Sequence, residues 1–329
     1  MSDKGVNFLQ AINRAMREEL AADPSVYVLG EDVAVGGPYG ATRGLAEEFG
    51  QNRVINTPIS ESTVVGLAIG AALQGLRPVV EVMFMDFITL AMDQLVNHGA
   101  KLRYMSGGQL KVPMTIRTLA GASGAWGAHH SQSLEAWLAH VPGLKVVMPS
   151  TAAEAEGLLR AAIRDDNPVV FIEHRALYWA TDDGIEAPKS CELGRGRIRR
   201  PGRDVTIVAT ARTLRTALEA AEKLAGEGVE AEVIDPRTIQ PLDVDLIAGS
   251  VRKTNRAVVV HEAVVSGGIG AEIAAQIQCA AFDYLDAPVE RIGAPFAPVP
   301  AAPNLEAAYL PSADQIAAAA RHALHRSSS

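Results

Sequence analysis

Glu61 is the residue whose type and position most strongly indicate chemistry. It ends the run RVINTPISE (53–61) and precedes a stretch rich in Gly, Ala and Val. Pro58 disfavours helix at Thr57 and Ser60 is a natural cap, so Glu61 falls in a first helical turn. A carboxylate in apolar surroundings is costly unless a partner binds it, which favours a functional role. The alternative is a first-turn glutamate stabilised by the helix dipole alone.

Three other patterns are weaker as signs of chemistry. The run SGGIG (266–270) follows a predicted strand ending at His261, but it lacks the third glycine of G-x-G-x-x-G, so a tight strand-to-helix turn explains it better than a dinucleotide site. The run GASGA (121–125) fails the G-x-S-x-G pattern of a nucleophile elbow. His129 and His130 are adjacent, so their side chains diverge, which disfavours a zinc pair.

Alternating strand and helix patterns position these groups in the first half of the chain. Runs rich in β-branched residues, separated by helical spacing, are typical of strands buried on both faces of a parallel sheet. The predicted strands are residues 26–29, 78–82, 114–117, 145–148 and 169–172. The predicted helices are residues 61–74, 90–101 and 150–164. The pattern indicates a doubly wound α/β domain over residues 1–178.

The pattern lapses over residues 179–202, which predict a connector whose arginines face solvent. Alternation then resumes and predicts a second doubly wound domain over residues 203–329. Its predicted strands are residues 204–210, 230–234 and 257–261, and its predicted helices are residues 214–225, 244–251 and a helix after 270. Four prolines between Pro295 and Pro303 predict an extended surface segment.

Composition excludes several classes of protein. The chain has 329 residues, 38 Asp and Glu against 30 Lys and Arg, and two cysteines. About 150 residues per domain gives roughly two domains. The net charge of −8 argues against a nucleic-acid partner, and two cysteines without ligand spacing argue against zinc, iron–sulfur or disulfide frameworks. We see neither a signal-like start nor an apolar stretch of ~20 residues, so we expect a cytoplasmic protein that does not cross a membrane.

Ordered motifs along the whole chain carry a resemblance to a known family. The motifs are LGEDV (29–33), RVINTPISE (53–61), AMDQ (91–94), YMSGG (104–108), HSQS (130–133), PGLKVV (142–147) and DPRTIQPL (235–242). In these, the sequence resembles the β subunit of the thiamine-diphosphate-dependent E1 component of 2-oxo acid dehydrogenase complexes. The resemblance implies an α/β fold of two doubly wound domains, a transketolase-type pyrimidine-binding domain and a transketolase C-terminal domain.

The resemblance assigns Glu61 to the cofactor. In this family, the glutamate of the T-P-I-S-E motif hydrogen-bonds N1′ of the aminopyrimidine of thiamine diphosphate, which favours the 4′-imino tautomer that acts as internal base. Phe87 matches the aromatic position that packs on this ring, and Ile59 and Met83 match its pocket. From the residues alone, Phe87 is equally a core phenylalanine at a strand-to-helix junction.

His130 matches the active-site histidine of the H-S-Q motif, which handles the substrate carboxylate or the dithiolane of the incoming lipoyl group. Histidine suits either task because its charge changes near neutrality. Taken alone, His130 would be a satisfied buried histidine. His129 is assigned no chemistry.

Family members also hold a structural monovalent cation, usually potassium, through oxygen ligands. Backbone carbonyls, an aspartate and an asparagine form a hard-oxygen set. The alternative, without a bound cation, is a capped helix end before Pro168. The matching positions are Met114, Thr115, Ala162, Asp165 and Asn167.

A missing motif implies a partner chain. The family places the diphosphate and Mg²⁺ in a G-D-G sequence, and the one Asp-Gly pair here, Asp183–Gly184, lacks the preceding glycine. The resemblance therefore implies that an E1 α subunit holds the diphosphate and Mg²⁺ in an α2β2 heterotetramer. It also implies that a dihydrolipoyl acyltransferase, the E2 component, docks mainly on the C-terminal domain.

We therefore predict an E1 β subunit that is active with its α subunit. The predicted reaction is decarboxylation of a 2-oxo acid, or cleavage of acetoin, on thiamine diphosphate, with acyl transfer to lipoyl-E2. The run FIEHRALY (171–178) slightly favours acetoin-type or branched-chain members of the family. The sequence does not decide which of these compounds is the substrate. The alternatives are the C-terminal subunit of a split transketolase or similar carboligase, and a non-catalytic assembly subunit of the same fold.

Overall fold

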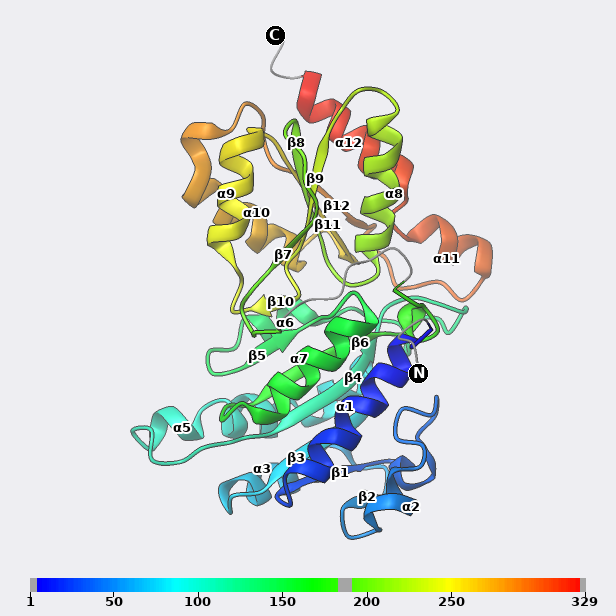
Figure 1. Cartoon of the computed structure of the whole chain (residues 1–329), viewed down its shortest axis with the longest axis vertical. Coiled ribbons are helices and arrows are strands. Elements are labelled where there is room, and N and C mark those ends of the chain that lie inside the picture. Colours follow the sequence, from blue (N-terminus) through cyan, green and yellow to red (C-terminus); the bar gives the residue numbers. More distant parts are fainter. Residues whose placement is uncertain (1–4, 183–190, 326–329) are drawn as a thin grey trace. The chain divides into compact units, whose positions relative to one another are not determined.

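The computed structural model describes residues 5–182 and 191–325 (Figure 1). Its contacts divide the chain into two compact units. The first unit comprises Met1–Ala120 and Trp137–Leu193, and the second comprises Gly121–Ala136 and Gly194–Ser329. Each unit is a largely parallel sheet with helices packed on it, which confirms the predicted α/β fold class. The second unit thus includes residues 121–136, which continuity along the sequence placed in the first domain.

The sheet of the first unit is parallel and deeply buried. Its strands are β1 (Val26–Gly30), β2 (Val54–Asn56), β3 (Arg77–Phe84), β4 (Thr115–Ala120), β5 (Lys145–Val147) and β6 (Val169–His174). Within the unit they lie in the order β5-β6-β4-β3-β1-β2. All residues of β1, β4 and β6 are buried, as expected for central strands covered on both faces. Gly30 is in register with Asn56 and with Glu81, so the carboxyl ends of β1, β2 and β3 share one edge.

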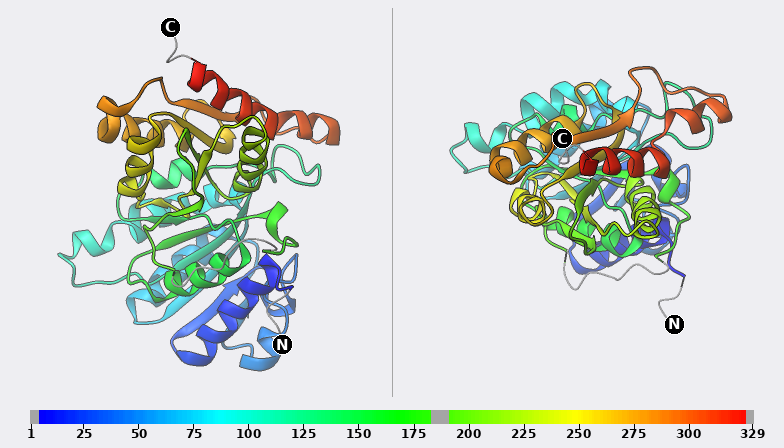
Figure 2. Two further views of the ribbon diagram at one scale, coloured as in Figure 1. Left: turned by 45° about the horizontal axis from the view of Figure 1, so that its top comes forward. Right: turned by 90° about the horizontal axis from the view of Figure 1, so that it is seen from above.

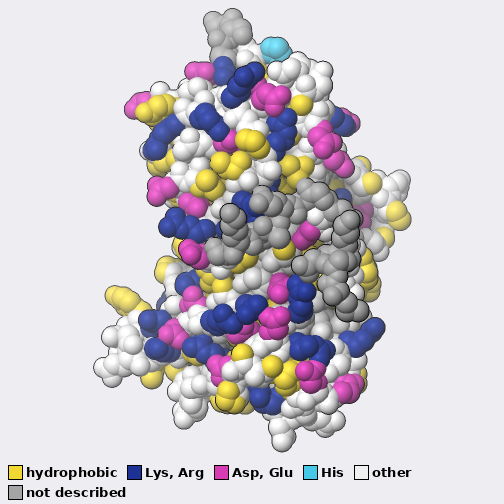
Figure 3. Space-filling model, viewed as in Figure 1, with side chains coloured by type: hydrophobic (Ala, Val, Ile, Leu, Met, Phe, Trp, Pro, Cys, Tyr) yellow, Lys and Arg dark blue, Asp and Glu magenta, His cyan; other side chains and the backbone are white. Residues whose placement is uncertain are grey.

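The helices of the first unit include four that our sequence analysis did not predict. They are α1 (Phe8–Ala22), α2 (Leu45–Phe49), α3 (Glu61–Leu73), α4 (Met85–Ile88), α5 (Leu102–Met105) and α7 (Ala152–Arg164). α1 and α7 lie side by side (Figure 1), and basic and acidic side chains alternate over them (Figure 3). A capping box between Asn7 and Gln10 starts α1, and Thr151 caps α7 as predicted.

The chain after β3 departs from the α-helix predicted over residues 90–101. A 3₁₀ turn (Thr89–Ala91) is followed by a π-helical segment, Asp93–Gly99. This segment packs tightly against α3, because a Cβ added at Gly66 would lie 3.4 Å from Gln94 Cγ. Packing against a neighbouring helix here outweighs the local preference for the α-helical period.

The second unit has a five-stranded sheet between two pairs of helices. Its strands are β7 (Arg197–Arg200), β8 (Val205–Ala209), β9 (Ala231–Asp235), β11 (Ala257–Val264) and β12 (Glu290–Ala294), in the order β12-β11-β8-β9-β7. The short strand β10 spans Thr238–Gln240. Only β7 is antiparallel to its neighbour among these pairs.

Two helix pairs cover the two faces of this sheet. The helices are α8 (Thr213–Ala225), α9 (Val244–Thr254), α10 (Ile269–Ala281), α11 (Pro303–Tyr309) and α12 (Ala313–His325). α8 packs with α12 on one face and α9 packs with α10 on the other, an arrangement that Figures 1 and 2 show. Alanine and leucine side chains of α8 and α12 form the core with valines of β8, β9 and β11. None of the helices within residues 5–182 and 191–325 is long and apolar enough to span a membrane.

The predicted connector, residues 179–202, contains a strand that the sequence analysis missed. Residues 183–190, with the Asp183–Gly184 pair, lie outside the described residues. β7 pairs with β9, and the Arg199 side chain is only 3% exposed, with Nη2 3.2 Å from Asp235 Oδ2. The prediction that the arginines face solvent is therefore wrong for Arg199, because an ion pair holds it inside the unit.

The glycines after β11 make a tight turn over a buried histidine. A Cβ at Gly268 would lie 2.6 Å from His261 Cε1, and one at Gly270 would lie 2.4 Å from His261 Cδ2. Burial, with a further contribution from Arg291, lowers the pKa of His261 to about 4. Close packing on a neutral imidazole thus accounts for these glycines without a dinucleotide.

Candidate active site

The carboxyl edge of β1, β2 and β3 carries the predicted catalytic glutamate. The loop after β2 is fixed by the Thr57 amide, which donates to the Gly30 carbonyl at 3.0 Å. Ser60 stands at the N-cap of α3, but its hydroxyl donates to Thr63 Oγ1 at 2.8 Å instead of accepting from a backbone amide. Glu61 is the first residue of α3, as the sequence predicted. Ligands of open α/β sheets bind beyond the carboxyl ends of strands, which is where this side chain lies.

The Glu61 carboxylate is half-buried and available to a ligand. Within the described part of the chain, its carboxylate oxygens take part in no hydrogen bond or ion pair. Burial raises the pKa of the neighbouring Glu31, and the charges of Asp32 and Glu61 raise it further. Glu31 and Asp32, directly after β1, and Glu61, at the start of α3, are thus close enough for their charges to act on one another.

The predicted aromatic and apolar residues lie at the same edge. Met83 precedes the last residue of β3, Phe87 lies in α4 directly after it, and both pack against the core of the first unit. The Phe87 ring meets Phe84 edge to face, with centroids 5.8 Å apart and planes at 87°. Ile59, in the loop after β2, is 73% exposed. β1 lies between β2 and β3, so these residues follow or end neighbouring strands of the sheet.

A buried ionic network ties the strands of this edge together. Arg117 on β4 donates to Glu81 on β3 at 2.6 Å and, through Nε and Nη2, to Glu173 on β6 at 2.7 and 3.0 Å. Tyr178 Oη donates to Glu173 at 2.5 Å. Burial raises the pKa of Glu81, with Arg117 opposing the rise, and the two glutamates hold the pKa of Arg117 above its usual value despite burial. This network could not be predicted from the sequence, because its members are far apart along the chain.

His130 lies in the second unit, so Glu61 and His130 belong to different units. The His130 ring is half-buried and its centroid lies 6.1 Å from that of Trp126, tilted by 51°. Its amide donates to the Gly127 carbonyl at 3.5 Å. His129 is exposed and lines a cavity, so the two imidazoles have different surroundings, as their adjacency predicted.

A cavity of about 500 Å³ in the second unit adjoins the His130 segment. Polar side chains on either side of His130 line one part of it, and apolar side chains of the proline-rich segment line another; the polar residues are His129, Ser131, Gln132 and Ser133. Sequence reasoning missed two residues of its lining, the carboxylate Glu262 and the phenol Tyr309. The position of Glu262 directly after the strand residue His261 was the available signal. The lining also includes Phe296, Pro298, Val299 and Val264.

The predicted cation ligands come together in the first unit. The Val169 amide donates to the Met114 carbonyl at 2.9 Å, and the Asp165 amide donates to the Ala162 carbonyl at 3.1 Å. Thr115 follows Met114 at the start of β4 and is buried. The Val112 amide donates to the Asp166 carbonyl at 3.1 Å and so joins the chain before β4 to the chain after α7.

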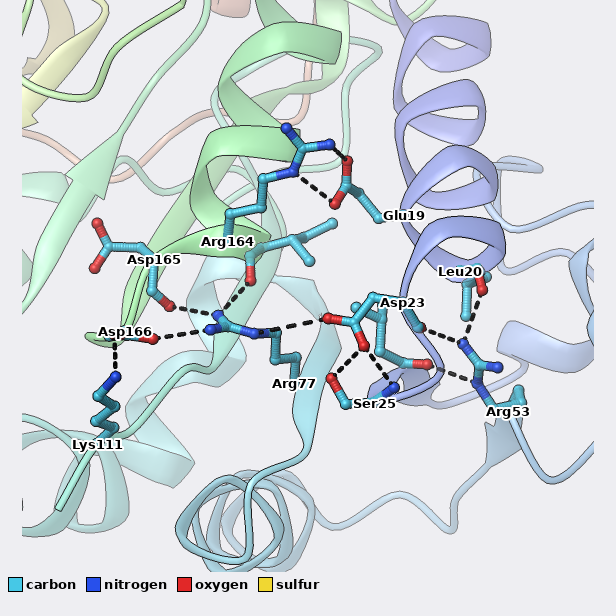
Figure 4. A network of polar contacts seen from close by, with 12 residues as sticks. Glu19, Leu20, Asp23, Ser25, Arg53, Arg77, Lys111, Arg164, Asp165 and Asp166 are labelled. Atoms are coloured by element: carbon cyan, nitrogen blue, oxygen red, sulfur yellow. Dashed lines mark hydrogen bonds and ion pairs between the residues drawn. The ribbon is translucent and has the colours of Figure 1, made fainter.

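Protein cations already bond several oxygens of this set. Arg77 Nη1 donates to the Asp165 carbonyl at 3.1 Å, as Figure 4 shows. Lys145 forms an ion pair with the Asp165 carboxylate. Arg103 donates to Asn167 Oδ1 at 2.8 Å. A carbonyl oxygen has two lone pairs, so the main-chain carbonyls fit a hard cation better than these side chains do. The described residues contain no cluster of three or more His, Cys, Asp or Glu side chains that could hold a metal ion.

Comparisons with known proteins define the class of this fold and site. The transketolase pyrimidine-binding domain family matches residues 4–180, and the transketolase C-terminal domain family matches residues 194–316. A solved structure titled "Split gene transketolase, inactive beta4 tetramer" superposes with a TM-score of 0.81 at 27% identity, covering 98% of this chain and 100% of that one.

Relatives at higher identity give the family. The β-2 subunit of the mitochondrial pyruvate dehydrogenase E1 component of Oryza sativa is 46% identical over 98% of this chain and 87% of its own length. The β subunit of acetoin:2,6-dichlorophenolindophenol oxidoreductase of Bacillus subtilis is 46% identical over 94% of this chain and 95% of its own length. The chain belongs to this family of transketolase-type E1 β subunits of 2-oxo acid and acetoin dehydrogenases. The resemblance and the main function predicted from the sequence are thus confirmed, and the split-transketolase alternative is not favoured.

Proposed function

We propose that this chain, together with an E1 α subunit, decarboxylates a 2-oxo acid or cleaves acetoin on thiamine diphosphate and passes the acyl group to lipoyl-E2. The identity of 45–47% to β subunits of pyruvate dehydrogenase and acetoin oxidoreductase supports both substrate classes equally. The single observation that carries the proposal is the free, half-buried Glu61 carboxylate at the shared strand edge.

The residues at this edge fit an aminopyrimidine. Glu61 offers an acidic group to a ring nitrogen, and Ile59, Met83 and Phe87 offer a flat apolar surface to the ring itself. Thr57 adds a buried hydroxyl that has no hydrogen-bond partner among the described residues. The matched family is described by its binding of a pyrimidine, which supports the same assignment.

Each residue has a defined task in this proposal. Bound thiamine diphosphate supplies the electron sink for loss of carbon dioxide. Glu61 holds a proton at N1′ of the pyrimidine and so selects the tautomer that the chemistry needs. Ile59, Met83 and Phe87 orient the ring and exclude water from it. His130 contacts the substrate carboxylate or the lipoyl acceptor.

Two further groups complete the proposed assembly. An α subunit holds the diphosphate and Mg²⁺, because the sequence lacks the G-D-G motif that binds them in this family. A monovalent cation binds where α7 meets β4, through the main-chain carbonyls of Met114, Thr115 and Ala162, with Asp165 and Asn167 as the neighbouring oxygens.

Replacing Glu61 by glutamine tests the proposal. In the α2β2 enzyme we expect Glu61→Gln to lower turnover of 2-oxo acid or acetoin at least about 100-fold, the typical value of a positioned proton transfer. Assembly and melting temperature are expected to stay at wild-type values. Glu47→Gln is the matched control, since Glu47 is an exposed first-turn glutamate of α2. Near-wild-type turnover of Glu61→Gln would refute the assignment, and turnover without any lipoyl acceptor would favour a carboligase.

A further inference from the structure

Two buried carboxylates hold the segment that carries His130 by its main chain. Glu262 Oε1, at the end of β11, accepts from the Ala122 amide at 2.5 Å. Glu306, in the first turn of α11, accepts from the Gly124 amide at 3.1 Å and from the Ala125 amide at 2.8 Å, one with each carboxylate oxygen. Glu262 is 7% exposed and Glu306 is 8% exposed. All five residues belong to the second unit.

The backbone of this segment is shaped to present its amides to an anion. Gly124 and Ala125 have φ values of +87° and +63° in succession. Adjacent amides in such a turn point to one side and form a concave site for a negative group. Ala125 is not glycine, so its left-handed conformation persists only because its surroundings hold it. The Glu306 carboxylate is the group that holds it.

The anchored amides lie next to the residues that support His130. Ala125 is followed by Trp126, whose ring centroid is 6.1 Å from that of His130. Two hydrogen bonds close the segment on itself, one from the Gly121 amide to the Gln132 carbonyl at 3.4 Å and one from the His130 amide to the Gly127 carbonyl at 3.5 Å. A shift at Ala125 therefore moves Trp126 and, through it, the imidazole.

We propose that Glu306 is a positioning residue for His130, with Glu262 as the second anchor of the same segment. The proposal rests on the role of His130 given under the proposed function. A carboxylate is required because it accepts through both oxygens, whereas a glutamine would present an NH₂ group to one of the two amides. Hydrogen bonds to a charged acceptor are also about twice as strong as neutral ones.

Hydrogen exchange in the assembled α2β2 enzyme tests the anchor directly. In Glu306→Gln we expect the amides of residues 122–130 to exchange at least about tenfold faster, the factor given by loss of one charge-assisted hydrogen bond. Glu222→Gln, an exposed glutamate of α8, is the charge-matched control and should leave exchange unchanged. Unchanged exchange in Glu306→Gln would overturn the anchor. If that variant does not assemble, Glu262→Gln, which weakens the hold on Ala122, gives the same readout.

A double-mutant cycle with His130→Ala separates positioning from a general loss of stability. We expect Glu306→Gln to lower kcat/KM about tenfold in the wild-type background and less than twofold when His130 is already alanine, because coupled residues are not additive. The affinity for thiamine diphosphate should not change. Equal losses in both backgrounds would overturn the positioning role. Wild-type turnover of His130→Ala would refute the proposed role of His130 and with it the positioning role, while hydrogen exchange would still decide the anchor.

Discussion

Replacing Glu135 by glutamine is expected to change how the stability of the protein depends on pH. Glu135 opens α6 (Glu135–Ala139), and its side chain is 1% exposed. Its Oε2 has no hydrogen-bond partner within the described residues. Burial, and to a smaller extent the charge of Glu262, raises the pKa of Glu135 to about 7, although its own backbone amide opposes the rise.

The sign and size of the effect follow from this pKa. Between pH 4.5 and 7 the unfolded chain loses the Glu135 proton while the folded protein keeps it, so folding becomes less favourable as pH rises through this window. A pKa of about 7 against 4.5 corresponds to roughly 3 kcal/mol, at about 1.4 kcal/mol per tenfold change in the acid constant. Glutamine does not titrate, so Glu135→Gln removes this contribution to the pH dependence of the free energy of unfolding.

Urea denaturation of the wild type and of Glu135→Gln at pH 5 and pH 8 provides the measurement. We expect the stability of the variant relative to the wild type to increase by about 2 kcal/mol between these pH values. The pKa of His261 is lowered to about 4, so the protein loses stability as pH falls below 6.5. This loss is the same in the wild type and in Glu135→Gln, so it cancels in the difference between them. Glu222→Gln, at an exposed site, should run parallel to the wild type. A difference that does not vary with pH would refute the reasoning.

Two further substitutions test the packing and the ionic network. Gly270→Ala is expected to lower the free energy of unfolding by at least about 2 kcal/mol, because the new Cβ would lie 2.4 Å from the His261 ring. Gly249→Ala in α9 is the control: its new Cβ would have nothing within 4 Å, so it should be neutral or stabilising by up to about 1 kcal/mol. Thermal melting of both variants provides the measurement. Arg117→Ala leaves two buried glutamates without their cation and should cost about 3–5 kcal/mol at neutral pH, so a melting temperature equal to the wild type would contradict the role of this network.

The periodicity of the sequence determined most of the regular elements. The runs that became β1, β3, β4 and β6 are largely apolar on both faces, and a strand in the middle of a parallel sheet buries both. The sequence placed Glu61 at the start of α3 through Pro58, which acts on the neighbouring backbone, and through Ser60, which stands at the N-cap although its hydroxyl caps no backbone amide. Local chemistry of this kind can be predicted without the fold.

Tertiary structure alone decided the features that depend on distant contacts. The π-helical turn at Asp93–Gly99 comes from packing on α3, and the strand β7 comes from pairing with β9. The anchoring of residues 121–136 through Glu306 joins positions about 180 residues apart, and the burial of Glu135 depends on the same folded surroundings. Sequence spacing fixes neighbours along one helix or strand, whereas the free energy of a buried charge is set by whichever residues the chain brings around it.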